Sequence, residues 1–457
     1  MDSEELSLKP WDNFLFTKIF RTFRMAVQPG KLTIAFSAIT LICAAGWVMD
    51  FTNTVVVLKD TQGNVVSTEL QIYLTNPDML QPYIESYKEK GARIGVFSTV
   101  WHFAAQRFHG TLNSLFAFNL PDVAVNIADY FKALGWAMKY HPFYSIIFFV
   151  IKLAVIALAG GSICRIAALQ SARGEKPGLS EAIRFGTKKF KSFFTAPLVP
   201  LAICTCMGLL IFLLGLIANI PRVGELIMAI FMFLALLTGA LVTIVLIGTI
   251  AGFNLMFPAI AYDGSDCFDA VSRSFNYVYS RPWRMAFYTA TAALYGAICY
   301  TFVRFFAFLL LWVTRWSLQL GIFTENGSRV NKLDAIWPQP SFMNLPGPAP
   351  LPTANWTEDI AAFLVSLCVL IVTGLVVSFV ISFYFSANTI IYAALRNRVD
   401  DTPLQDVYRH PEQPKDTKID TPDNDKTDPA ENKKPKSKKR QSKKIPKIPE
   451  DKAPSEQ

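Results

Sequence analysis

Two cationic side chains lie inside long apolar stretches of this sequence. Lys152 is in the run 143–163 and Arg304 is in the run 285–313. About ten residues of a helix precede Lys152 in its run, which at about 1.5 Å per residue places it about 15 Å deep in a membrane. A charge at that depth is costly and needs a partner, so one interpretation is an anionic lipid headgroup or solute bound near Lys152 and Arg304. The structural alternative is that Lys152 bonds backbone carbonyls of neighbouring helices while Arg304 extends toward the membrane surface.

Other residue types that carry out catalysis do not form a convincing pattern. His102 and His109 are seven residues apart and share a helical face, but no carboxylate lies nearby in the sequence to complete a metal site. Cys204 and Cys206 point to different faces of a helix, and no second pair accompanies them. The apolar runs contain no carboxylate or histidine in their interior, and no nucleophile elbow, Walker loop or dinucleotide-binding loop occurs. We therefore predict a protein that is not an enzyme and has no cofactor or metal ion.

Basic residues outside the apolar runs are candidates for binding lipid phosphates. Much of the net charge of +9 lies near the C-terminus, where nine Lys and Arg and no acid occur between 433 and 447. A basic segment beside a membrane is attracted to anionic lipid by about 1 kcal/mol per residue, and the same charges would attract nucleic acid or a ribosome without sequence selectivity. The candidates are Arg21, Arg24, Arg184, Lys188, Lys189, Lys191, Arg273, Arg284, Lys433, Lys434, Lys436, Lys438, Lys439, Arg440, Lys443 and Lys444.

The amino-acid composition predicts the class of protein that carries these residues. Of 457 residues, 52% are hydrophobic and only 17% are charged, and the mean hydropathy is +0.31. This excludes a single soluble globular enzyme and favours an all-α integral membrane bundle. The six predicted transmembrane helices are 32–49, 143–163, 194–217, 226–253, 285–313 and 360–386. The first run is long enough to span and follows a charged leader (1–31), so we interpret it as a retained anchor rather than a signal peptide.

The distribution of Lys and Arg beside the runs predicts the orientation. The connection 171–193 has six Lys and Arg against two acids, whereas the short connection after 217 has only Arg222. Since cytoplasmic loops are enriched in Lys and Arg, both termini should be cytoplasmic in a bacterial cytoplasmic membrane. The loops 50–142 and 314–359 then face outward.

The two long cytoplasmic connections, 171–193 and 262–284, share one construction. Glu-Ala-Ile at 181–183 matches Asp-Ala-Val at 269–271, and a weaker third copy begins with Arg-Thr-Phe at 21–23. Each predicts a short amphipathic helix before a span, within internally repeated units of span, amphipathic helix and span. Such a helix would lie in the membrane surface with its Lys and Arg toward phosphates, or would pack on the bundle as a linker.

One of these segments resembles a known group of proteins. The sequence Asp-Ala-Val-Ser-Arg-Ser-Phe-Asn-Tyr-Val-Tyr-Ser-Arg-Pro-Trp-Arg at 269–284, within a six-span repeat, resembles a broad group of bacterial polytopic inner-membrane proteins. That group includes the membrane domain attached to some glycerophosphodiester phosphodiesterases, and the resemblance covers 143–398. The catalytic domain of those enzymes, with its His-Arg-Gly signature and acidic metal ligands, has no match here. The resemblance therefore implies an accessory membrane module without hydrolase activity.

The outer loop 50–142 is too long to be structureless, and we expect a small α+β insertion that caps the bundle. Residues 54–74 predict two strands around a turn at 62–64, and helical spacing follows at 77–90, 97–118 and 121–139.

The remaining segments predict little regular structure. The loop 314–359 is rich in proline at 337–352 and should run extended there. It could bind a partner or simply cross a surface. The span at 360–386 should continue as a cytoplasmic extension to 398, and the tail 399–457, acidic and then basic, should be disordered.

These features together predict a membrane protein that organises or senses the membrane, or serves as the membrane subunit of an assembly. Its expected partners are membrane lipids, mainly anionic, and a protein bound through the outer cap or the C-terminal tail. One alternative is a permease or lipid transporter with an anionic ligand near Lys152. A further alternative is a membrane biogenesis factor whose tail binds ribosomes or nucleic acid.

Overall fold

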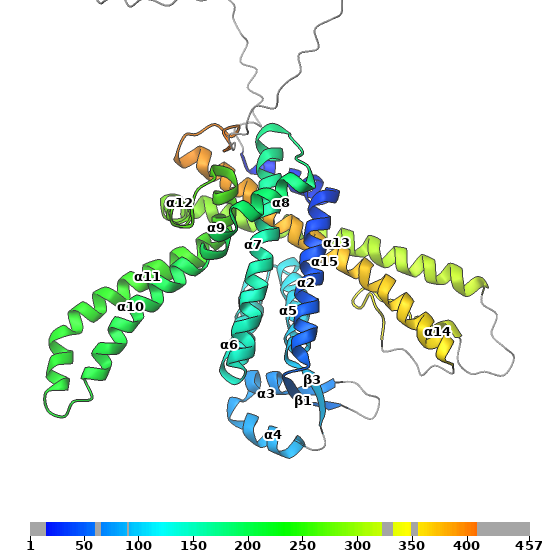
Figure 1. Ribbon diagram of the computed structural model, residues 1–457, viewed down its shortest axis with the longest axis horizontal. Coiled ribbons are helices and arrows are strands. Elements are labelled where there is room, and N and C mark those ends of the chain that lie inside the picture. Colours follow the sequence, from blue (N-terminus) through cyan, green and yellow to red (C-terminus); the bar gives the residue numbers. More distant parts are fainter. Residues whose placement is uncertain (1–14, 60–64, 89–90, 322–331, 349–354, 409–457) are drawn as a thin grey trace, which may run out of the picture. The chain divides into compact units, whose positions relative to one another are not determined.

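The computed structural model describes residues 15–59, 65–88, 91–321, 332–348 and 355–408 (Figure 1). Within these residues, six helices are long and apolar enough to cross a membrane. They are α2 (Pro29–Asp50), α7 (Pro142–Arg173), α10 (Leu198–Ile217), α11 (Gly224–Asp263), α13 (Pro282–Gly321) and α15 (Trp356–Val399). The chain is therefore an integral membrane protein with one helix for each predicted apolar run.

Several of these helices are longer than the apolar runs that predicted them. Proline occupies the first position of α2, α7 and α13, where its missing N–H costs nothing. Gly174 and Gly264 end α7 and α11 in the left-handed conformation, with φ of 74° and 65°. We call the side on which α2, α10 and α13 begin and α7, α11 and α15 end the basic side, and the opposite side the loop side.

Short helices lie on the basic side before α2, α10 and α13, as predicted. They are η2 (Leu15–Arg21), α1 (Thr22–Ala26), α8 (Leu179–Lys188), α9 (Phe190–Thr195) and α12 (Cys267–Ser280). Each of α9 and α12 buries apolar side chains in the main core, for example Phe193 and Tyr277. Other apolar side chains of these helices, such as Leu179 and Phe268, are exposed. The same helices thus pack on the bundle and still present apolar residues outward.

The main core lies toward the basic side, where the last turns of α7, α11 and α15 come together. It contains the runs of small and apolar residues 167–169, 259–261 and 393–395, with Met25 and Ala26 of α1. Alanine at these positions lets the helix backbones approach closely, which is how helices associate when lipid offers no hydrophobic driving force. This contact explains why the helices continue past the apolar runs: their ends are held by protein rather than by lipid.

The hairpin of α10 and α11 has a different environment. The two helices contact each other. In the most apolar 18-residue stretch of α11 no residue is buried inside the protein, and in the corresponding stretch of α10 only 6% of the residues are. In a bilayer, acyl chains cover such a surface, so these side chains need no protein partner.

A three-stranded antiparallel sheet lies on the loop side, in the order β2-β1-β3. The strands are β1 (Thr54–Lys59), β2 (Val65–Thr68) and β3 (Ala92–Gly95). Val57 pairs with Thr68 and Val55 with Ile94. The predicted pair of strands is present, its turn at 62–64 lies outside the described residues, and β3 was not predicted.

The second predicted strand ends early, because helix α3 (Glu69–Thr75) begins where the strand was expected to continue. Thr68 and Gln71 form a capping box: the Gln71 N–H donates to Thr68 Oγ1 at 3.2 Å, and the Thr68 N–H donates to Gln71 Oε1 at 3.1 Å. The two reciprocal bonds satisfy donors at the helix start and fix the change from strand to helix. The short helices η3 (Pro77–Met79) and α4 (Leu80–Tyr87) follow.

Helices α5 (Val96–Phe116) and α6 (Leu120–Tyr140) correspond to the predicted helices at 97–118 and 121–139. They contact each other, and they also contact the spans: α5 contacts α2 and α13, and α6 contacts α7. The ring of Phe108 lies edge-on to Tyr300 of α13 at 5.3 Å. These helices are therefore packed along the bundle, whereas we predicted only a cap over it.

The proline-rich loop is fastened to the spans by arginines. After the short helix α14 (Lys332–Ile336), residues 338–348 form no regular element, as their prolines predict. Arg315 of α13 donates to the carbonyl of Trp337 at 3.0 Å and pairs with Asp334. Arg304 donates to the carbonyls of Phe342 and Met343 at 2.8 Å each. Residues 349–354 lie outside the described residues.

The segment 400–408, which we had assigned to the disordered tail, packs on the basic side. Tyr408 donates its backbone N–H to the Tyr262 carbonyl at 2.9 Å, and Val407 is buried. Arg396 donates to the Asp406 carbonyl at 2.7 Å. This segment has few apolar residues, and it is held by hydrogen bonds to the ends of α11 and α15. Composition alone does not predict these bonds. The rest of the predicted tail, 409–457, lies outside the described residues.

Candidate functional site

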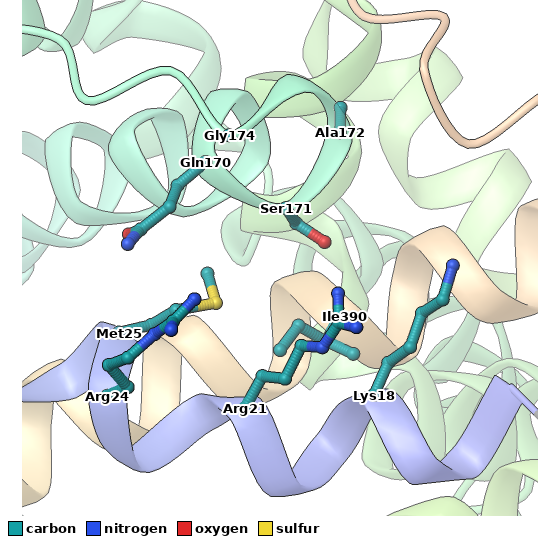
Figure 2. A pocket seen from close by; sticks show the side chains of 9 residues that line it. All are labelled: Lys18, Arg21, Arg24, Met25, Gln170, Ser171, Ala172, Gly174 and Ile390. Atoms are coloured by element: carbon teal, nitrogen blue, oxygen red, sulfur yellow. The ribbon is translucent and has the colours of Figure 1, made fainter.

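A cavity of about 290 Å³ on the basic side brings together two of the predicted lipid-binding residues, Arg21 and Arg24, with Lys18. It lies between η2 and α1 on one side and the last turn of α7 on the other (Figure 2). Lys18 and Arg21 extend from η2 toward Ser171, and Gln170 extends from α7 toward Arg24. The cavity lining contains no Asp, Glu, His or Cys among the described residues.

The local fold aligns the three cations. Lys18 and Arg21 belong to the 3₁₀-helix η2, in which residues three apart share a face, and Arg24 follows three residues later in α1, so the three side chains form one row. The neighbouring row, Ile19, Thr22 and Met25, is buried and anchors the segment to the bundle. Anchoring one row places the other along the edge of α7.

Lys31, in the first turn of α2, lies behind the cavity and is fully buried. Its ammonium donates to Gln170 Oε1 at 3.0 Å and to Ser386 Oγ at 3.4 Å. Both partners are neutral, and within the described residues Lys31 has no acidic partner. Because burying an ammonium ion costs several kcal/mol, a neighbouring anion would be stabilising here.

Two of the cations that line the cavity have no acidic side chain beside them among the described residues. Neither Arg21 nor Arg24 forms an ion pair within the part of the chain that the structure describes. A structural role is open to them, because cations near the C-terminal end of a helix such as α7 are favoured by its dipole. Guanidinium groups also bind phosphate and carboxylate through paired hydrogen bonds. With no carboxylate or histidine in the lining, the chemistry that this site offers is anion binding rather than acid-base catalysis.

The other predicted basic residues lie elsewhere. Arg184, Lys188, Lys191 and Arg284 are exposed outside the cavity. Lys189 donates to the Gly264 carbonyl at 2.5 Å and lies over the Tyr408 ring. The predicted residues of the tail, from Lys433 to Lys444, lie outside the described residues.

Arg273, also predicted to bind lipid, instead belongs to an ion-pair network at the ends of α11, α12 and α15. It pairs with Asp269 at 2.9 Å and approaches Asp263 at 3.6 Å. Burial opposes the charge of Arg273, but the Asp263 and Asp269 carboxylates outweigh it and raise the pKa of the guanidinium. Arg273 therefore has protein partners for its charge.

The two cations found within apolar runs differ in their surroundings. Arg304 is only 7% exposed, and its donors are satisfied by the Phe342 and Met343 carbonyls, the Tyr300 hydroxyl and His109. It lines a second cavity of about 230 Å³ with these residues. Lys152 is partly buried in α7 and has no hydrogen-bond or ion-pair partner among the described residues. The structure does not bring Lys152 and Arg304 into contact.

No group of three or more His, Cys, Asp and Glu side chains in the described residues is placed to hold a metal ion. His109 faces Arg304 and Tyr300 rather than His102. Cys204 and Cys206 are free thiols.

Several buried charges were missed by sequence reasoning, because we counted only Lys152 and Arg304 within the apolar runs. The helices extend beyond those runs and include Lys31, Arg165, Arg315 and Arg396. All four are buried. Lys31 directly precedes the first apolar run, so the sequence places it near the membrane surface. No local pattern predicts that Lys31 is buried and donates to Gln170 and Ser386.

Comparisons with protein-family models, with curated proteins and with solved structures find no match to this chain. The family resemblance of the segment 269–284 therefore stays an expectation.

Proposed function

We propose that this chain is a non-enzymatic membrane protein that binds anionic lipid on its basic side, and that it organises or senses the membrane or is the membrane subunit of an assembly. The observation that carries the proposal is the cavity in which Lys18, Arg21 and Arg24 form one row beside the last turn of α7. Lys31, buried behind it, donates to Gln170 of the cavity lining. Lipid phosphates lie at the membrane level where the spans begin, so positively charged side chains at that level can bind them.

The orientation belongs to the same proposal. The basic side would face the cytoplasm of a bacterial cell, with both termini there, because Lys and Arg are concentrated beside the helix ends on that side. The chain would contain internally repeated units of span, amphipathic helix and span. The placement of α1, α9 and α12 directly before α2, α10 and α13 supports this arrangement.

Lipid retention tests the proposal. The full chain is reconstituted in phosphatidylcholine nanodiscs containing phosphatidylglycerol, transferred to mild detergent and examined by native mass spectrometry. We expect phosphatidylglycerol to be retained in preference to phosphatidylcholine, and less of it to be retained by the double variant Arg21→Gln, Arg24→Gln.

The matched control is Arg184→Gln, which removes an exposed arginine of α8 that does not line the cavity. It should retain lipid like the wild type. A wild-type protein that retains both lipids equally, or a double variant that retains as much phosphatidylglycerol as Arg184→Gln, would overturn the proposal.

A second candidate function is favoured by Lys152. An ammonium within a span, with no bonding partner among the described residues, suits a permease or lipid transporter that holds an anionic ligand there. The variant Lys152→Met tests this in the producing cells. A protein that folds and inserts normally but loses its cellular phenotype supports transport, whereas a variant with the wild-type phenotype rejects it.

A further inference from the structure

The charges around the basic cavity exceed what one singly charged headgroup would balance. Arg21 and Arg24 form no ion pair within the described residues, and Lys18 lines the same cavity. A phosphodiester headgroup such as that of phosphatidylglycerol supplies one negative charge. We propose that the ligand of this cavity is a phospholipid headgroup that carries two negative charges, an inference that rests on the proposed function.

Gln170 adds a donor that suits a phosphate oxygen. The Gln170 amide oxygen faces Lys31, whose Nζ donates to Gln170 Oε1 at 3.0 Å. The amide nitrogen of Gln170 is then available to the cavity that this residue lines (Figure 2). Lys31 therefore acts as a positioning residue, since it fixes which end of the amide a ligand meets.

The size of the cavity agrees with such a headgroup. Its volume of about 290 Å³ is roughly ten times the share of one water molecule in the liquid, which leaves room for a phosphate group and its ester linkage. Three cationic side chains in one row and an amide opposite them can contact several phosphate oxygens at once.

A lipid suits the site better than a soluble phosphate because apolar side chains lie beside the cations. Phe20 and Val27 belong to the same segment as Arg21 and Arg24, and they are 49% and 42% exposed. The segment directly precedes α2, so it lies where acyl chains meet headgroups. Acyl chains would cover Phe20 and Val27, whereas a soluble phosphate would leave them exposed to water.

The experiment compares lipids at equal total headgroup charge. The full chain is placed in phosphatidylcholine nanodiscs doped with phosphatidylglycerol, with phosphatidic acid or with cardiolipin, at mildly alkaline pH so that the phosphate monoester is doubly ionised. Native mass spectrometry then counts retained lipids. We expect phosphatidic acid or cardiolipin to be retained about tenfold more tightly per molecule than phosphatidylglycerol.

Gln170→Glu is the decisive variant. A carboxylate at this position would pair with Lys31, so the fold should be at least as stable, but it would repel a phosphate. We expect this variant to keep its thermal stability and lose the preference for the doubly charged lipids, while Arg184→Gln keeps it.

The outcomes separate this inference from the proposed function. Equal retention of all three anionic lipids at matched charge, or a Gln170→Glu variant that keeps the preference, overturns the inference and leaves the proposed function in place. Failure to retain any anionic lipid above phosphatidylcholine overturns both. Displacement of bound phosphatidic acid by soluble glycerol 3-phosphate at comparable concentration would show a site for free phosphate and overturn the assignment to lipid.

Discussion

Arg396 of α15 and Asp263 of α11 form an ion pair, with Arg396 Nε and Asp263 Oδ1 3.1 Å apart. The Nε–H does not point at the carboxylate, so this contact is an ion pair without a hydrogen bond. Asp263 also accepts a hydrogen bond from the Tyr392 hydroxyl and approaches Arg273 at 3.6 Å. One carboxylate thus joins the end of α11 to α12, which follows it directly, and to α15, whose Tyr392 is 129 residues away in the sequence.

Asp263→Asn should destabilise the protein strongly. The amide can still accept from Tyr392, but it leaves Arg396, which is buried, without this opposite charge. Breaking a buried pair by removing one partner costs about 3 to 5 kcal/mol, and we expect the lower end of this range because Asp406 still lies 3.3 Å from Arg396. Thermal unfolding of the purified protein in detergent measures the effect, with Glu225→Gln, an exposed acid in the first turn of α11, as the control. Equal melting temperatures for the two variants would contradict the role of this pair.

Asp50 caps the start of α5, and its loss should loosen that helix. Its carboxylate accepts from the backbone N–H groups of Phe97 at 2.7 Å and Ser98 at 3.0 Å, and from the Ser98 hydroxyl at 2.7 Å. Replacing a capping side chain by alanine costs about 1 to 2 kcal/mol. We therefore expect Asp50→Ala to increase hydrogen exchange in the first turns of α5.

Gly95→Ala should have the same effect as Asp50→Ala without removing a charge. A Cβ at Gly95 would lie 1.9 Å from Asp50 Cγ, so the carboxylate must move away from the amides that it caps. Gly135→Ala in α6 is the matched control, because nothing lies within 4 Å of a Cβ there. Protection of α5 that survives Gly95→Ala would show that the Asp50 carboxylate is not held against this turn.

Gly161→Ala and Gly215→Ala should act in opposite directions. A Cβ at Gly161 would lie 2.6 Å from the ring of Phe193, which is fully buried and has no room to move. Overpacking of this kind typically costs about 1 to 3 kcal/mol. At Gly215 in α10 a Cβ meets nothing within 4 Å, and alanine is favoured over glycine in a helix by about 1 kcal/mol. Melting temperatures in detergent should fall for the first variant and stay level or rise for the second; the reverse order would contradict the packing of α7 on α9.

Glu69 should make the stability of the loop-side sheet depend on pH. Burial raises the pKa of this carboxyl, although the Val56 N–H and Arg93 offset part of the increase. A carboxyl with a higher pKa in the fold than in the unfolded chain binds more protons when folded. Stability therefore falls as the pH rises from the unfolded pKa through the folded pKa.

We expect amide protection factors in β1 to decrease over this mildly acidic range in the wild type and to be nearly constant in Glu69→Gln. The control Glu85→Gln, at an exposed position of α4, should behave like the wild type. A pH dependence that persists unchanged in Glu69→Gln would assign it to another group.

Local signals in the sequence predicted much of the fold. Apolar runs located every span, and the β-branched residues of 54–58 predicted β1. The Thr68 to Gln71 capping box was also present as a local pattern, but we extended the strand through it. Strand β3 was missed because Ala-Arg-Ile-Gly is too short and mixed to predict a strand without the partner that β1 supplies.

The helices α5 and α6 show the limit of such signals. Their spacing predicted helices, but the length of the loop 50–142 predicted only a cap over the bundle. Contact with α13 depends on Tyr300 and Arg304 meeting Phe108 and His109, some 190 residues away in the chain. Arg304, which we considered for anion binding, instead donates its hydrogen bonds to this contact and to the carbonyls of Phe342 and Met343.

The sequence by itself determined that this is a membrane protein with clustered basic residues, and it located the six spans found among the described residues, because hydropathy and charge are properties of each segment alone. Only the tertiary structure decided which basic residues share a site. Lys18, Arg21 and Arg24 gain their cavity from the end of α7, and Lys31 meets Gln170 across 139 residues of sequence. Side chains distant along the chain interact only after helix packing brings them together, and burial in that packing makes the charged form of Lys31 costly unless an anion lies beside it.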